Sequence, residues 1–114
     1  MDELIKHLPQ LVPQLENALG QNPDALRQVR KARVRRVTFD ADSQAGYVYT
    51  HPSRDLSAVE QNIVGVKHGR TIEIPGDIWM YIDLDNFDRL TGIEVLDVSH
   101  ELCTLLTGLS NRFP

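Results

Sequence analysis

The sequence predicts an α+β fold: an antiparallel β-meander of four to six strands with N-terminal helices and one short C-terminal helix. The spacing of apolar residues leads to this prediction. They recur at three- and four-residue steps at the start of the chain, alternate with polar residues through its middle, and return to helical spacing near its end. We expect residues 1–32 to form a helical arm and residues 33–114 the meander with its C-terminal helix, together one compact domain.

The N-terminal arm is predicted to hold three helices. Its leucines form one apolar stripe, which two prolines interrupt because proline lacks an amide donor and clashes with the preceding turn. We therefore expect a short helix, a break, and a second helix that ends near Gly20 as its left-handed cap. Asn22-Pro23-Asp24 predicts the start of a third helix, since it combines a capping side chain, a proline and an acid. The stripe is Leu4, Leu8, Leu11, Leu15 and Leu19, and the prolines are Pro9 and Pro13.

From Arg33 the apolar period falls to two, which is typical of strands. Residues 57–67 fit no single pattern, although residues 62–66 suit an edge strand. Clusters of Pro, Gly, Asp, Asn and Ser mark the turns. The first predicted strands are residues 37–40, 47–50 and 71–74, and the turns or loops are residues 42–44, 51–55, 67–70, 75–77 and 85–88.

The strand predicted over residues 78–84 is apolar on both faces, which indicates a central position or an interface. Trp79 and Tyr81 form its second face. Either the N-terminal helices cover these rings, or the helices pack on another subunit and the rings lie at an interface. We favour burial within the chain, because it has two helical elements for two sheet faces. The first face holds Ile78, Met80, Ile82 and Leu84.

The last strand is predicted over residues 90–98. Its apolar phase slips between Val95 and Leu96, and a β-bulge is the simplest way to absorb the extra residue. Ser99 is expected to cap a final helix, which Gly108 is expected to end. This helix has four leucines at i, i+3, i+4 and i+7, namely Leu102, Leu105, Leu106 and Leu109.

Two blocks of the predicted sheet carry a recognisable pattern. The first is residues 37–48, VTFDADSQAGYV, and the second joins residues 82–85, IDLD, to residues 91–99, TGIEVLDVS. This pattern resembles a small prokaryotic domain-of-unknown-function family (number twenty-two eighty-three), whose opening typically reads I-T-Y-D-x-x-A-D-A-L-Y-I. The resemblance covers roughly residues 36–107.

The chain departs from that family pattern at two places. Gln44 stands where the family has its second aspartate, and Phe87-Asp88 replaces an aspartate-glycine turn. The resemblance implies a compact sheet with a helix, and a frequent genomic setting beside small toxin-like or mobile-element genes. It implies no established activity.

The composition excludes several classes of protein. With 41% hydrophobic and 25% charged residues and a formal net charge of −4, the chain is not disordered as a whole. No apolar stretch is long enough to span a membrane, and acids near the N-terminus do not fit a signal peptide. Cys103 is the only cysteine, which leaves no intramolecular disulfide and no zinc framework. We therefore expect a cytoplasmic protein that does not contact membranes.

Positive charge is concentrated in one stretch. Residues 1–36 carry seven basic and four acidic side chains, a net charge of +3, whereas residues 37–114 carry five and twelve, a net charge of −7. Clustered cations favour an anionic ligand or partner, and the alternatives are a solvated helix face or balance for the acidic remainder. Nucleic acid is not favoured, because no aromatic residue is interleaved with them. This basic run is Arg27, Arg30, Lys31, Arg33, Arg35 and Arg36.

The acidic residues around the predicted turn at residues 85–88 do not predict a metal site. Asp83, Asp85 and Glu94 fall at positions 1, 3 and 12 of a calcium loop. Positions 5 and 6 need an oxygen ligand and a glycine, but Phe87 and Asp88 occupy them. A structural turn is therefore expected.

These observations predict a non-catalytic binding protein without a cofactor or metal. No nucleophile motif or phosphate loop is present, and pairs such as His51 with Asp55 are common without catalysis. We expect a small bacterial or phage protein of the antitoxin, immunity or anti-defence type, which binds another protein and forms a homodimer; if the rings of Trp79 and Tyr81 are not covered within the chain, they are the expected interface residues. The alternative is sequestration of a nucleotide or other anionic ligand by the basic run.

Overall fold

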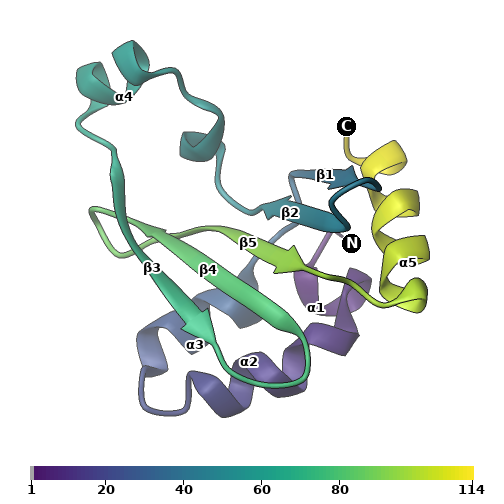
Figure 1. Cartoon of the computed structure of the whole chain (residues 1–114). Helices are drawn as coiled ribbons and strands as arrows, with labels where there is room; N and C mark the ends of the chain where they lie inside the picture. The colour runs from purple at the N-terminus through teal and green to yellow at the C-terminus, as the bar shows by residue number, and fades with distance from the viewer. Residues whose placement is uncertain (1) are drawn as a thin grey trace.

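The computed structural model describes residues 2–114 and has the α+β fold that the sequence predicts (Figure 1). Five antiparallel strands form one sheet in this part of the chain. The strands are β1 (Arg36–Asp40), β2 (Ala45–Tyr49), β3 (His68–Ile74), β4 (Trp79–Asp85) and β5 (Leu90–Leu96). The helices are α1 (Leu4–His7), α2 (Val12–Ala18), α3 (Pro23–Lys31), α4 (Ala58–Val64) and α5 (His100–Arg112), with 3-10 turns η1 (Pro9–Leu11) and η2 (Pro52–Asp55).

The sheet joins a hairpin to a meander. β1 pairs with β2, β4 pairs with both β3 and β5, and β2 pairs with β5, so the order is β1-β2-β5-β4-β3. Residues 50–67 cross from the middle of the sheet to its far edge and contain η2 and α4. This crossover lies on one side of the sheet, and the other helices lie on the opposite side (Figure 1). Within the described residues, no helix has the length and hydrophobicity that a membrane span requires.

One face of the sheet is covered by helices and holds the hydrophobic core. Val37, Val48, Ile93 and Ile82 stand in one row across four strands, and each is at most 1% exposed. The leucine stripe of the arm is buried in the same cluster of side chains. The N-terminal helices therefore pack on their own sheet, because the two apolar surfaces bury each other.

Gln14 of α2 attaches the arm to the turn between β3 and β4. Its amide nitrogen donates to the carbonyls of Ile74 and Ile78 at 3.1 and 2.7 Å, and its amide oxygen accepts the Ile78 N–H at 3.1 Å. Gly76 is required at this turn, since a Cβ there would lie 2.3 Å from the Gln14 side chain and its φ is 145°. One polar side chain thus satisfies several backbone groups of the turn.

Helix α5 covers the end of the same face near β1. Its N-terminus is capped by Ser99 as predicted. Leu106 packs where Gly46 has no side chain, and a Cβ on Gly46 would lie 3.0 Å from it. The Val37 N–H donates to the Phe113 carbonyl at 2.8 Å, so the edge strand β1 is also bonded to the end of this helix.

The edge strand predicted over residues 62–66 is wrong, because residues 62–64 form the last turn of helix α4 and Gly65 caps it. Ser57 and Glu60 form a reciprocal capping box, and Gly65 ends the helix with a left-handed φ of 73°. These local signals outweigh the strand propensity of the β-branched residues. None of the residues of α4 is buried, and Val59, Ile63 and Val64 are all exposed.

The bulge in the last strand lies at Thr91, near the start of β5, and not between Val95 and Leu96. Leu96 still pairs regularly with β4. The change of apolar phase instead marks the end of the strand, where Asp97 with a φ of 47° turns the chain toward α5.

Neither predicted helix-ending glycine acts as a cap. α2 ends at Ala18, and Gly20 does not adopt the left-handed conformation. α5 continues past Gly108 to Arg112. Gly108 faces open space, and an interior glycine costs a helix only about 1 kcal/mol relative to alanine.

Candidate functional site

Four residues of the basic run line one groove in the structure, and the other two lie outside it in ion pairs. The basic groove has a volume of about 450 Å³ and lies between the end of α3 and residues 50–52. Arg30 and Arg36 do not line it, because Arg30 pairs with Glu16 at 2.8 Å and Arg36 with Asp55 at 3.0 Å. The cationic residues that line the groove are Arg27, Lys31, Arg33 and Arg35.

Helix spacing and strand spacing together bring these four side chains to one place. Arg27 and Lys31 lie about one turn apart on α3 and share a helix face. α3 ends at Lys31, and the extended segment that follows has Arg33 and Arg35 on either side of Val34. Because Val34 is only 3% exposed, both arginines point away from the core and into solvent.

All the charged side chains that line the basic groove are positive. No acidic side chain of the described chain lines it. Lys31, Arg33 and Arg35 are exposed and form no ion pair within residues 2–114. Arg27 pairs with Asp24 at 2.9 Å, but both side chains are mostly exposed and water screens this pair. The remaining lining is largely apolar and includes Ala32, Pro52 and Leu90.

His51 also lines the groove, although the basic run alone does not predict it. Its Nδ1 accepts the Ser53 backbone N–H at 3.1 Å, so the neutral ring carries its proton on Nε2. Burial and the nearby Arg89 and Arg35 lower the pKa of His51 below its ordinary value, against an opposing effect of Asp85. The neutral imidazole therefore brings an N–H donor to the groove and no additional charge.

Trp79 and Tyr81 form an aromatic patch on the sheet face that α1–α3 and α5 leave open. The prediction that the N-terminal helices bury these rings is wrong, because those helices all pack on the opposite face (Figure 1). Trp79 is 52% exposed, and its Nε1–H donates to the Tyr81 hydroxyl at 3.0 Å. Across the strands, Tyr81 is paired with Glu73 on one side and Glu94 on the other. The aromatic patch therefore has acidic neighbours.

The rest of this face carries a hydrogen-bonded cluster that attaches the crossover to the sheet. The Tyr47 hydroxyl donates to Asp83 Oδ2 at 2.5 Å and accepts from Arg54 Nε at 2.9 Å. Thr71 donates to the other oxygen of Asp83 at 2.6 Å. Burial and the hydrogen bond to Asp83 raise the pKa of Tyr47 far above its ordinary value, so the phenol stays protonated. This cluster holds η2 in place, and its hydroxyls already donate within it.

Hydrogen bonds to Asp85 hold together the acidic turn between β4 and β5. Asp85 accepts the backbone N–H groups of Phe87 and Arg89 at 2.8 and 2.9 Å, and Arg89 Nε at 2.8 Å. Burial acts to raise the pKa of Asp85, but these hydrogen bonds and the Arg89 charge outweigh it and hold the pKa below its ordinary value. Across residues 2–114, no group of three or more His, Cys, Asp or Glu side chains is arranged to hold a metal ion.

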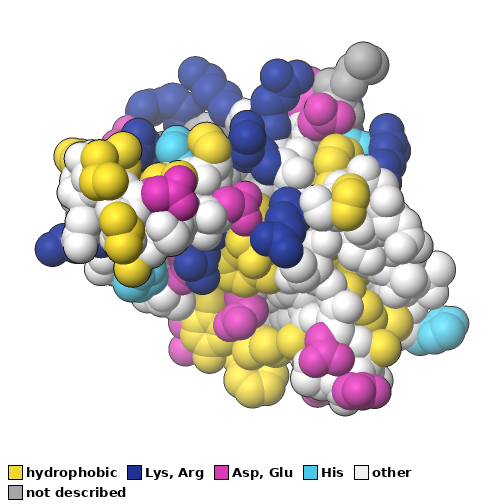
Figure 2. Space-filling model, turned by 90° about the horizontal axis from the view of Figure 1, so that it is seen from above, with side chains coloured by type: hydrophobic (Ala, Val, Ile, Leu, Met, Phe, Trp, Pro, Cys, Tyr) yellow, Lys and Arg dark blue, Asp and Glu magenta, His cyan; other side chains and the backbone are white. Residues whose placement is uncertain are grey.

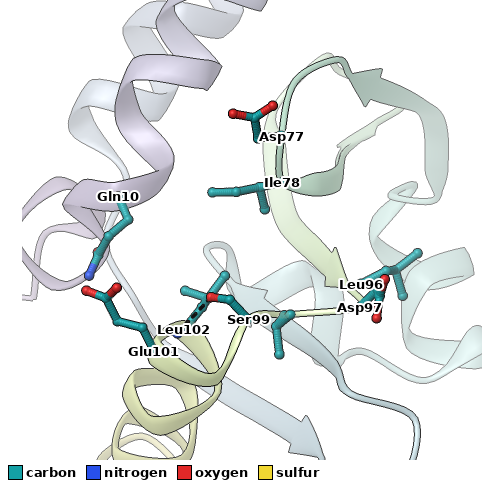
Figure 3. Close-up of a pocket in the computed structure, with 9 residues that line it drawn as sticks. Gln10, Asp77, Ile78, Leu96, Asp97, Ser99, Glu101 and Leu102 are labelled. Carbon is teal, nitrogen blue, oxygen red and sulfur yellow. Dashed lines mark hydrogen bonds between the residues drawn. The ribbon is translucent and has the colours of Figure 1, made fainter.

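A separate pocket of about 340 Å³ opens beside the start of α5 (Figure 3). Its three carboxylates come from Asp77, Asp97 and Glu101, and they lie on different sides of the pocket (Figure 3). No histidine, lysine or arginine lines it. The three acids lie apart from one another, and no basic side chain of the lining faces them.

The basic groove and the aromatic patch differ in the charge of the residues around them. In Figure 2, which views the molecule from above, Lys and Arg side chains gather in the upper half of the view among acidic and hydrophobic side chains, whereas its lower edge shows mainly hydrophobic and acidic ones.

Comparison with known proteins adds no functional assignment. The chain matches no family model, no curated protein and no solved structure. The resemblance to the domain-of-unknown-function family therefore stays a prediction.

Proposed function

We propose that this chain is a non-catalytic binding protein whose aromatic patch docks onto a partner protein with a basic surface. The observation that carries the proposal is Trp79, which is 52% exposed on a paired strand of the sheet. Tryptophan is enriched among the residues that dominate binding energy at interface centres. The hydrogen bond between Trp79 and Tyr81 orients both rings before a partner arrives, which reduces the entropy lost on binding.

The charge around the aromatic patch favours a basic partner. Glu73 and Glu94 stand on either side of it in the neighbouring strands, and Asp77 and Asp97 lie near the end of β4 that carries Trp79. A partner arginine can stack on the tryptophan ring and pair with these acids. Two copies packed through this same face would bring like charges together, so we favour a different protein over a homodimer as the occupant.

This role agrees with the antitoxin, immunity or anti-defence type expected from the sequence, acting in the cytoplasm of a bacterium or phage-infected cell. Proteins of that kind work by occupying a surface of their target. In the described part of the chain, no group of three or more His, Cys, Asp or Glu side chains is arranged to hold a metal ion, and the acids of the pocket beside α5 lie apart. The proposal requires no cofactor and no catalytic group.

The aromatic patch contains a built-in reporter of binding, since Trp79 is the only tryptophan of the chain. Proteins captured from the native host on the immobilised chain would be purified and titrated one by one against it. Docking through the patch should shift the Trp79 emission to shorter wavelength. Trp79→Ala should weaken the binding of a partner that docks on the patch by about 2 kcal/mol, which is roughly a thirtyfold increase in Kd.

Phe87→Ala is the matched control, because Phe87 is 59% exposed but lies at the turn between β4 and β5, away from the patch. It should leave the Kd within about twofold. Equal affinity of the Trp79→Ala and Phe87→Ala variants for every purified partner would contradict the proposal. A homodimer that Trp79→Ala converts to monomers, seen by light scattering, would replace the basic partner with a second copy.

A further inference from the structure

The basic groove holds positive charge that docking through the aromatic patch does not use. Lys31, Arg33 and Arg35 are exposed there without an ion-pair partner in residues 2–114, and no acid lines the groove. Like charges so close together repel one another, and an anion relieves that repulsion. This arrangement is not needed for the fold, because none of the three side chains contributes to the core.

The groups of the groove are suited to a phosphate. Guanidinium groups present paired N–H donors that match phosphate oxygens, and Lys31 adds an ammonium group. Neutral His51 adds an Nε2–H donor. The Thr50 hydroxyl already donates to the Leu90 carbonyl at 3.1 Å, so the groove offers free donors mainly from charged side chains.

The unpaired charge is confined to a short region. Arg30 and Arg36 lie outside the groove and are each paired with an acid, so the unpaired charge of the basic run is confined to the groove. A nucleic-acid strand presents a phosphate at every nucleotide and needs a longer basic track. The confinement therefore favours one phosphate group over a chain of them. These two pairs are Arg30 with Glu16 and Arg36 with Asp55.

The groove has room for more than a phosphate. Its volume of about 450 Å³ lies in the range of small-molecule sites, which is about 300–1,000 Å³. Its wall includes the apolar side chains of Ala32, Pro52 and Leu90. We propose that the basic groove binds a small phosphomonoester whose uncharged portion is apolar or aromatic, such as a nucleoside monophosphate.

The test is a titration calorimetry series at constant ionic strength with AMP, adenosine and inorganic phosphate. AMP should bind most tightly, inorganic phosphate at least tenfold more weakly, and adenosine without measurable heat. Arg35→Ala should raise the Kd for AMP at least tenfold. Arg30→Ala removes the same charge from the end of α3 but outside the groove, and it should change the Kd by less than twofold. Both positions are exposed, so both variants should fold.

Three results would overturn the proposal. The first is no binding of AMP or phosphate at millimolar concentration. The second is an equal loss in the Arg35→Ala and Arg30→Ala variants, which would indicate general charge attraction. The third is tighter binding of single-stranded oligonucleotides with affinity that rises with their length, which would assign the groove to nucleic acid. Trp79→Ala should bind AMP like the native chain, so failure of this site and failure of the aromatic patch are distinguishable.

Discussion

The two faces of the sheet are made from the same strands but have opposite surroundings. On the covered face, Ile82 and Ile93 pair across β4 and β5 and are fully buried. On the open face, Tyr81 pairs with Glu94, and Trp79 remains 52% exposed. Successive residues of a strand point to opposite faces, so neighbours in the sequence serve different purposes. Substitutions on one face should change stability, and substitutions on the other should change binding.

The largest loss of stability is expected from Ile93→Ala on the covered face. Removing a fully buried isoleucine side chain leaves a cavity in the centre of the sheet. The free energy of unfolding should fall by about 2–5 kcal/mol, measured by urea denaturation. A loss below about 1 kcal/mol would show that the covered face is not the core.

A smaller loss is expected from Gly92→Ala, on the part of the open face where Tyr47 lies. A Cβ at Gly92 would come within 2.2 Å of the Tyr47 hydroxyl and displace it from Asp83. The expected cost is about 1–3 kcal/mol in the same urea experiment. Gly108→Ala is the matched control, because this glycine faces open space inside α5, and it should stabilise the chain by up to about 1 kcal/mol. Equal changes in the free energy of unfolding for the two substitutions would show that the hydrogen bond between Tyr47 and Asp83 does not stabilise the fold.

Because of Asp85 in the turn that joins β4 to β5, the free energy of unfolding should depend on pH in the acidic range. The folded pKa of Asp85 lies below its ordinary value near 3.9, so its carboxylate stabilises the fold fully above that pH. That contribution is lost as the pH falls through the lower folded pKa. Asp85→Asn should therefore cost about 2 kcal/mol near pH 7 and progressively less below pH 4, measured by urea denaturation across pH. A difference between the two proteins that does not change with pH would contradict this account.

Local signals predicted the helices better than the strand details. The start of α3 follows from Asn22, whose side chain accepts the Ala25 N–H, and the start of α5 follows from Ser99. The same kind of signal, the capping box of Ser57 and Glu60, also specifies α4, but the β-branched residues after it favoured a strand. The bulge at Thr91 was misplaced because it depends on pairing with β4, which the sequence of β5 alone does not contain.

The candidate surfaces were predicted only in part, because their definition depends on distant residues. Glu16 and Asp55 remove Arg30 and Arg36 from the groove, and no spacing within the basic run indicates either pairing. The position of His51 beside the groove could have been predicted from the hairpin of β1 and β2. Arg36 pairs with Tyr49 in this antiparallel hairpin, so the residues after Tyr49 run alongside those before Arg36. The exposure of Trp79 could not have been predicted in this way, because it depends on which face of the sheet the N-terminal helices cover.

The smallest change in stability is expected from Trp79→Ala, although its effect on binding should be large. About half of the Trp79 side chain is already exposed, so truncation should lower the free energy of unfolding by only about 1–2 kcal/mol and leave the chain folded. The decisive measurement is the Kd of a purified basic partner for the native chain and for this folded variant. The account predicts roughly thirtyfold weaker binding while the variant stays folded. An unchanged Kd in a stably folded Trp79→Ala variant would contradict it.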